Sequence, residues 1–220
     1  MSSTARMYLL TASAAMLAIA GADAPASAQG VAAHSKIKQP VTAAACKREP
    51  GKNFFVEFRA RTAASYGHSF VLHGRLGAPG KFGKFEVAGL HPRGDDPAVY
   101  MQGHVVPVPA ETGASDGDLD EQYLTARYCV VLNQAEYNKA TAHIRRLQAT
   151  TKEWHAPTNN CNSFIGDIAR HMGLRAPPTH ILYPESYVNM LGDLNDNAGS
   201  LAALVPGFPY KQWGIPQRKR

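Results

Sequence analysis

The sequence predicts a single α+β domain in which an antiparallel sheet packs against helices. Alternating apolar residues, typical of strands, occur between residues 54 and 132, and apolar positions with helical spacing follow only after them. The composition agrees, because 220 residues with 45% hydrophobic and 18% charged residues suit one domain with tails and exclude a disordered chain. No apolar run reaches the roughly 18 residues of a membrane-spanning helix, and no internal repeat of about 20–50 residues is visible.

The first 28 residues have the composition of a secretory signal peptide. Arg6 supplies a positive charge, residues 7–20 are apolar, and Ala26-Ser27-Ala28 matches the small-residue pattern of a cleavage site. We therefore expect an exported protein, periplasmic or secreted, whose mature chain begins near Gln29 and has no transmembrane segment. The residues from there to Gly51 show little periodicity and are expected to form a loosely ordered lead-in.

The expected strands follow one another along the chain, with turns rich in glycine and proline between them. They are residues 54–61, 68–73 and 84–90, a short edge strand around Val105, Val106 and Val108, and residues 128–132. Residues 111–121 contain five acidic residues among glycine and serine. We expect this segment to be a solvated loop.

Three helices are expected after the strands. They cover residues 133–148, 159–172 and 184–194. The first opens with Asn133 and Glu136 at the spacing of a capping box. Gly173 stands where a left-handed cap is expected at the end of the second, whose apolar residues form one stripe. The domain is thus expected over residues 52–196, followed by an irregular basic tail over residues 197–220.

Three cysteines in an exported chain leave at least one thiol that is free or paired between chains. Cys129 lies in an apolar strand and Cys46 in the lead-in, whereas Cys161 lies among asparagine and serine residues. We expect a disulfide between Cys46 and Cys129, with Cys161 free. The free thiol is then either a buried, inert group or a reactive one.

The chemistry concentrates at Cys161. It falls in the first turn of an expected helix, where backbone N–H groups and the helix dipole favour a thiolate. A thiol hydrolase needs that thiolate beside an imidazole that accepts the proton. His68 is the candidate, because it stands at the start of an expected strand. The alternative interpretation of Cys161 is a structural cysteine in a capped helix.

The segments Gly67-His68-Ser69-Phe70 and Asn159–Phe164 together resemble those of the circularly permuted papain-like enzymes. In that superfamily the histidine strand precedes the cysteine helix. Its members include lecithin retinol acyltransferase-like proteins, PPPDE isopeptidases and relatives of the NlpC-type cell-wall peptidases. The cysteine segment is close to the PPPDE motif, and the histidine segment is more similar to exported bacterial members of uncharacterised function. The resemblance spans roughly residues 54–194, with about ten residues in its specific part.

The resemblance implies a permuted papain-like fold with the cysteine at a helix N-terminus, and it implies site roles. Cys161 matches the nucleophile, and its backbone N–H would form one arm of an oxyanion hole. His68 matches the general base. The family usually adds a polar residue on the next strand to orient the imidazole.

The expected register of the second and third strands favours His91 as the orienting group. A hairpin centred near Pro79-Gly80 places His68 opposite His91, and directly opposed residues share a sheet face. The same register places His73 opposite Glu86. Because His73 is five residues from His68, it is expected on the other face and outside the site. The alternative for His91 is an ordinary loop histidine.

No cofactor and no metal site is expected. The nine histidines include no H-E-x-x-H pattern, the cysteines include no C-x-x-C pattern, and no cluster has ligand spacing. The chain also lacks a glycine-rich phosphate loop and a basic patch interleaved with aromatic residues, so nucleic acid is not an expected partner.

Three functions remain open. The first is an exported cysteine hydrolase that cleaves amide bonds in cell-wall peptide or protein. The second uses the same dyad on a lipid-type substrate as an acyltransferase or hydrolase. The third is a catalytically inert module that binds the cell envelope. The sequence does not indicate an oligomeric state.

Overall fold

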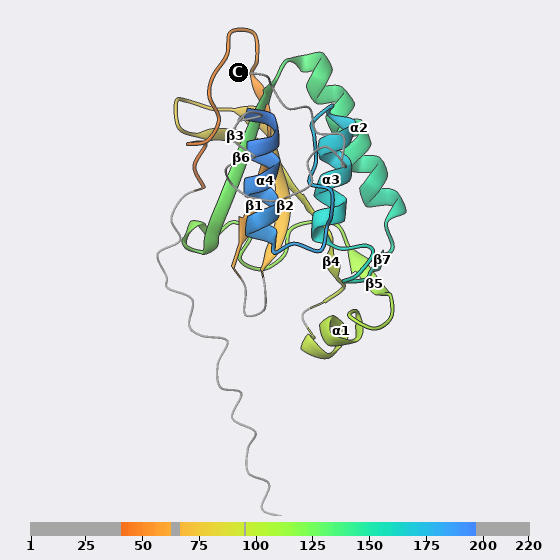
Figure 1. Cartoon of the computed structure of the whole chain (residues 1–220). Helices are drawn as coiled ribbons and strands as arrows, with labels where there is room; N and C mark the ends of the chain where they lie inside the picture. The colour runs from red at the N-terminus through yellow and green to blue at the C-terminus, as the bar shows by residue number, and fades with distance from the viewer. Residues whose placement is uncertain (1–40, 63–66, 95, 197–220) are drawn as a thin grey trace, which may run out of the picture. The chain divides into compact units, whose positions relative to one another are not determined.

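The computed structural model describes residues 41–62, 67–94 and 96–196 (Figure 1). The expected signal peptide, the first part of the lead-in and the C-terminal tail lie outside the described residues. None of the helices in these ranges has the length and hydrophobicity needed to cross a bilayer.

The described residues form an α+β structure around a four-stranded antiparallel sheet in the order β3-β2-β1-β6. The strands are β1 (Phe54–Arg61), β2 (His68–Leu76), β3 (Phe82–Gly89) and β6 (Leu124–Leu132). All four were predicted, and β6 begins four residues earlier than the apolar run indicated. An antiparallel sheet packed against helices, the predicted fold class, is confirmed at this level.

A small second sheet has the strand order β4-β5-β7. Its strands are β4 (His91–Pro92), β5 (Val108–Glu111) and β7 (Glu153–Trp154). The expected edge strand was therefore placed too early, because Val105 and Val106 lie in a turn and pairing begins only after Pro107, which has no N–H to donate. A 3₁₀ turn, η1 (Glu121–Tyr123), precedes β6.

Four helices complete the described fold: α1 (Pro97–Gln102), α2 (Gln134–Thr150), α3 (Cys161–His171) and α4 (Pro184–Asp196). The predicted capping box of α2 is present, with Asn133 and Glu136 each bonding the other's backbone N–H. Gly173 has φ +80° after α3, the left-handed conformation predicted for its cap. Helix α1 was not predicted; its only sequence signal is Asp96 as N-cap before Pro97.

The strand register agrees with the predicted hairpin. Phe70 pairs with Gly89 and His73 with Glu86. This is the register that we predicted from the sequence, and it places His68 near His91. Paired residues share a face, so Ser69, Val71 and His73 lie on one face of β2, and His68 and Phe70 lie on the other.

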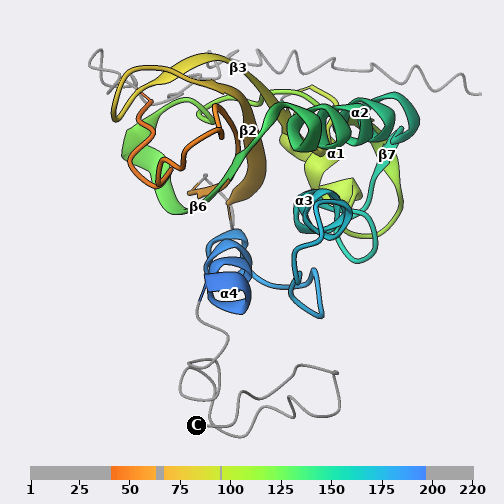
Figure 2. The same ribbon diagram turned by 90° about the horizontal axis from the view of Figure 1, so that it is seen from above.

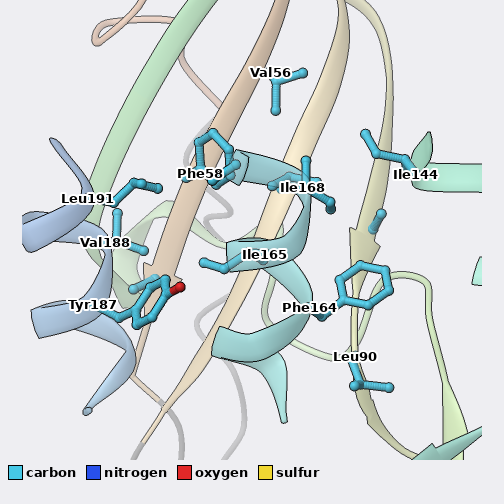
Figure 3. Close-up of a cluster of buried hydrophobic side chains, with 14 of the residues drawn as sticks. Val56, Phe58, Leu90, Ile144, Phe164, Ile165, Ile168, Tyr187, Val188 and Leu191 are labelled. Carbon is cyan, nitrogen blue, oxygen red and sulfur yellow. The ribbon is translucent and has the colours of Figure 1, made fainter. Parts of the chain in front are cut away.

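The first face of the sheet packs against the helices. Figure 3 shows α3 in front of the strands with α4 beside it, and apolar side chains from all of these elements meet in one cluster. The buried members include Val56, Phe58, Ile165, Ile168 and Val188. They alternate along the strands and recur at helical spacing on α3 and α4, which explains why both periodicities are visible in the sequence.

The second face is covered by residues 41–52, around which the strands curl in Figure 2. Ala43 is buried there against the strands, and the predicted disulfide joins Cys46 to Cys129, with Cα atoms 5.0 Å apart. Cys161 is the free cysteine, also as predicted. The expectation of a loosely ordered lead-in is thus wrong for its last part, because a disulfide and buried contacts anchor it to the sheet.

Candidate active site at the start of α3

The N-terminus of α3 joins the start of β2. Asn160 caps the helix by accepting a hydrogen bond from the Ser163 N–H at 3.0 Å, and Cys161 is the first helical residue. The Ser69 hydroxyl donates a buried hydrogen bond to the Asn162 side-chain oxygen at 2.8 Å. This bond joins Ser69, which faces the helices, to the second residue of α3.

His68 lies on the other face of β2, beside Asp118 and His91, and the described residues show no contact between its imidazole and Cys161. The structure therefore brings the starts of β2 and α3 together without bringing the two side chains together.

The segment before α4 lies over this junction. The Asn162 side-chain amide donates to the carbonyls of Leu182 at 2.7 Å and His180 at 3.2 Å, and the Asn160 amide donates to the same His180 carbonyl. Cys161 is consequently 3% exposed. A nucleophile must be reached by its substrate, but here both asparagines that mark the helix start also bind the segment that covers the sulfur.

Burial also reverses the expected acidity of the thiol. Desolvation raises the pKa of Cys161 above its ordinary value, against the opposing effect of the nearby Ser69 hydroxyl and of the backbone N–H groups of Ser69, Asn162 and Cys161 itself. These donors surround the sulfur, as predicted for a helix start. They favour the thiolate, but their effect is smaller than the cost of removing the sulfur from water. Cys161 is therefore a neutral thiol at neutral pH.

His68 is also buried, and its imidazole is neutral at neutral pH. Desolvation lowers the pKa of His68 to about 4; the carboxylate of Asp118 opposes this shift, and the charges of Arg61 and His91 reinforce it. The His68 Nε2 atom lies 3.9 Å from an Asp118 carboxylate oxygen, and it has no hydrogen-bond partner among the described residues. A neutral imidazole can accept a proton, but a pKa of about 4 makes His68 a weak base in this resting structure.

The structure brings His91 to His68, as the register argument predicted. The two rings meet edge to face with centroids 5.9 Å apart, and His91 Nδ1 lies 3.0 Å from the Pro92 carbonyl. We assign the His91 proton to Nδ1, which donates to that carbonyl and leaves Nε2 as an acceptor. His73 lies on the helix-facing side of the sheet, with Nδ1 3.3 Å from the Tyr137 hydroxyl, so its predicted exclusion from the His68 site is confirmed.

Asp118 and Arg61 belong to the site although the sequence did not indicate them. The Arg61 Nε donates to Asp118 at 2.6 Å, and the Ser115 N–H donates to the other carboxylate oxygen at 2.8 Å. Asp118 is 3% exposed and Asp120 is also buried, and the Glu121 side chain pairs with Arg59 and Arg127. The prediction of a solvated acidic loop is therefore wrong at these three acidic residues. The Arg61 guanidinium and the Ser115 N–H satisfy the buried Asp118 carboxylate, and the pairing of Arg61 with His68 across β1 and β2 places it beside the imidazole.

A pocket of about 310 Å³ lies beside this end of the sheet. It is lined by Arg61, Thr62, Thr125, Tyr183, Glu185 and Ser186. Arg61 pairs directly with His68, and Pro184 packs near Gly67, the residue before it. The pocket therefore adjoins the strand end that presents His68, and its lining is polar and carries both signs of charge.

Comparison with known proteins gives no match: no protein-family profile, no curated protein and no solved structure is similar to this chain. The site geometry is therefore the basis for the functional argument.

The raised pKa of Cys161 predicts how its alkylation depends on pH. Because the buried thiol is neutral at neutral pH, the rate with iodoacetamide should be low there and rise continuously into the alkaline range as the thiolate forms. Mass mapping of the Cys161 peptide after timed quenching measures the rate. The denatured protein is the control, and its rate should level off at lower pH. A native rate that is already on a plateau below neutral pH would contradict the raised pKa.

Proposed function

We propose that this protein is an exported cysteine hydrolase that cleaves amide bonds, with Cys161 as nucleophile and His68 as general base. The observation that supports it best is the buried Ser69–Asn162 hydrogen bond, because it joins the strand start that bears the imidazole to the helix start that bears the thiol. The order of histidine strand before cysteine helix is the one implied by the resemblance to permuted papain-like enzymes.

In the proposed mechanism, the start of β2 rearranges on substrate binding so that the His68 imidazole, which in the structure lies on the face of β2 away from Cys161, reaches the thiol and accepts its proton. The new thiolate attacks the substrate carbonyl, and the backbone N–H of Cys161 donates to the oxyanion that develops. The imidazolium then protonates the leaving amine, which departs and leaves an acyl thioester on Cys161. Water, deprotonated by the same imidazole, releases the acid and restores the thiol.

The imidazole–carboxylate arrangement supports His68 as a base. A distance of 3.9 Å between Nε2 and Asp118 is longer than a hydrogen bond, as is common before a substrate closes a site. The carboxylate favours the imidazolium that forms when His68 accepts the proton. Arg61 and Ser115 hold Asp118 in place, so in this proposal Asp118 acts as a positioning residue through His68. His91 is the alternative orienting group.

The pocket favours an amide-containing peptide over a lipid. Its lining offers a guanidinium from Arg61, a carboxylate from Glu185 and hydroxyls from Thr62, Thr125 and Ser186. Such groups bind peptide N–H, C=O and terminal charges, whereas an acyl chain needs apolar walls. In the proposed exported compartment, cell-wall peptide and protein are the substrates with this chemistry.

A lipid-type substrate is the second candidate, favoured by two exposed side chains. Ile181 is 72% exposed and Tyr183 is 68% exposed, and they flank Leu182, whose carbonyl binds Asn162 beside Cys161. An inert binding module is the third, favoured by the burial of the Cys161 sulfur.

One substrate panel separates these candidates. We expect the purified protein without its signal peptide to release new amino groups from cell-wall peptide fragments or a protein substrate, and to leave phospholipid vesicles intact. Cys161→Ser is the control and should release none. Fatty acid release or acyl transfer from phospholipid, lost in Cys161→Ser, would replace the amidase with the lipid enzyme. The absence of turnover on every substrate would favour the binding module.

A further inference from the structure

The second face of the sheet contains a cluster of metal-ligating groups that the proposed hydrolase does not use. The sulfurs of Cys46 and Cys129 and a carboxylate oxygen of Glu57 all lie within 4.8 Å of one another. Glu57 and Cys129 pair directly across β1 and β6, so two of the three groups are placed by strand register. Cys46 comes from the lead-in, which the disulfide anchors to the sheet.

The Glu57 carboxylate is arranged as a metal ligand would be. Glu57 is 0% exposed, and one of its oxygens, Oε2, accepts a hydrogen bond from Arg59 Nε. The other oxygen, Oε1, is buried and has no hydrogen-bond partner among the described residues. A buried acceptor without a donor is unfavourable, and a metal ion would satisfy it. A hydrogen bond that orients the remaining oxygen is typical of metal-binding carboxylates.

The neighbouring charges are compatible with an anionic ligand set. Two thiolates and one carboxylate would carry three negative charges, which a divalent ion reduces to one. Arg59 bonds Glu57, and both Arg59 and Arg127 also bond Glu121, so two guanidinium groups and one further carboxylate surround the cluster. The net positive charge of these neighbours would balance the remaining negative charge.

We propose that the dithiol form of this protein binds a thiophilic divalent ion, zinc in the first instance, through Cys46, Cys129 and Glu57, and that disulfide formation releases it. Three protein ligands leave a fourth tetrahedral position for water. Binding replaces the two thiol protons, which pass to solvent. On oxidation each thiolate gives one electron to a two-electron oxidant, such as an incoming disulfide; the sulfurs join, and the ion leaves. The site thus exchanges a metal ion for the disulfide seen in the structure.

The test measures zinc binding by the full mature chain in a Cys161→Ser background, so that the third thiol cannot contribute. The protein is reduced with a dithiol that is then removed under argon, and zinc is titrated against a chromophoric chelator. We expect about one ion per reduced chain and no binding at this site by the oxidised chain. With cobalt in place of zinc, we expect thiolate-to-metal charge-transfer absorption that disappears on oxidation.

Two variants assign the ligands. Glu57→Gln should weaken zinc binding by the reduced chain at least about tenfold, whereas Glu49→Gln, an exposed carboxylate three residues from Cys46, should leave it unchanged. In the parent chain, zinc should slow alkylation of Cys46 and Cys129, a readout that does not depend on whether a variant folds. Unaltered alkylation, or no stoichiometric binding by the reduced chain, would overturn the proposal. Unchanged affinity in a folded Glu57→Gln chain would remove Glu57 from the site and overturn it as stated.

Discussion

Replacing Cys161 with alanine is expected to abolish amide hydrolysis, and His68→Ala is expected to lower kcat/KM by at least about a hundredfold. The reason is that the buried thiol is neutral at neutral pH, so it becomes a nucleophile only when a base accepts its proton. Combining the two changes should cost little beyond Cys161→Ala alone, because residues that act as one unit are non-additive. Steady-state kinetics on the best substrate of the panel measure all three variants.

His73→Gln is the matched control for the histidine change. His73 lies in the same strand as His68 and is 2% exposed, but it points to the opposite face of the sheet. It should keep near parental kcat/KM even if the free energy of unfolding falls, and urea unfolding of each variant separates loss of folding from loss of function. Near parental activity in folded His68→Ala would mean that another base serves Cys161.

Removal of the disulfide should produce the largest change in stability. The bridge joins residues 83 positions apart, and closing a loop of that length restricts the unfolded chain by roughly 4 kcal/mol. We therefore expect the Cys46→Ala/Cys129→Ala double variant to lose about 2–5 kcal/mol of unfolding free energy in urea, with a chelator present to exclude zinc. It would also free the lead-in from the sheet face that it covers.

The comparison variant for this effect is Cys161→Ala, which removes a cysteine without removing the bridge. A double variant that unfolds at the same urea concentration as the parent would show that the lead-in is held by its buried contacts alone. Peptide mapping without reduction should show Cys46 and Cys129 in one linked fragment, and that linkage is consistent with an oxidising compartment.

Local signals were sufficient to predict most of the fold. The alternation in β1 and β2, the capping box of α2 and the glycine after α3 depend on neighbours a few residues away, and each is visible in the sequence. The hairpin register was also predictable, because a turn near Gly80 determines which residues pair. The last part of the lead-in was not, since its order depends on a disulfide to a residue 83 positions away.

The site was predictable only in part, because some of its contacts join residues that are far apart in the sequence. Cys161 and His68 each have a local signature, and His91 followed from strand pairing. Asp118 has no such local signature. An acidic residue in a glycine-rich loop gives the same sequence pattern whether its carboxylate is solvated or paired with Arg61, which is 57 positions away. The burial of Cys161 likewise depends on carbonyls near residues 180–182 that bind Asn162. Acidity predicted from a helix start alone was therefore wrong in direction.

Catalysis by Cys161 requires a covalent acyl group on its sulfur during turnover. Acid quenching during turnover, followed by mass mapping, should show the Cys161 peptide with the added mass of the substrate acyl group, and hydroxylamine should remove it as expected for a thioester. We expect this adduct in the parent chain and none in Cys161→Ser. Turnover that continues while the Cys161 peptide stays unmodified, and that survives in Cys161→Ala, would contradict catalysis by Cys161.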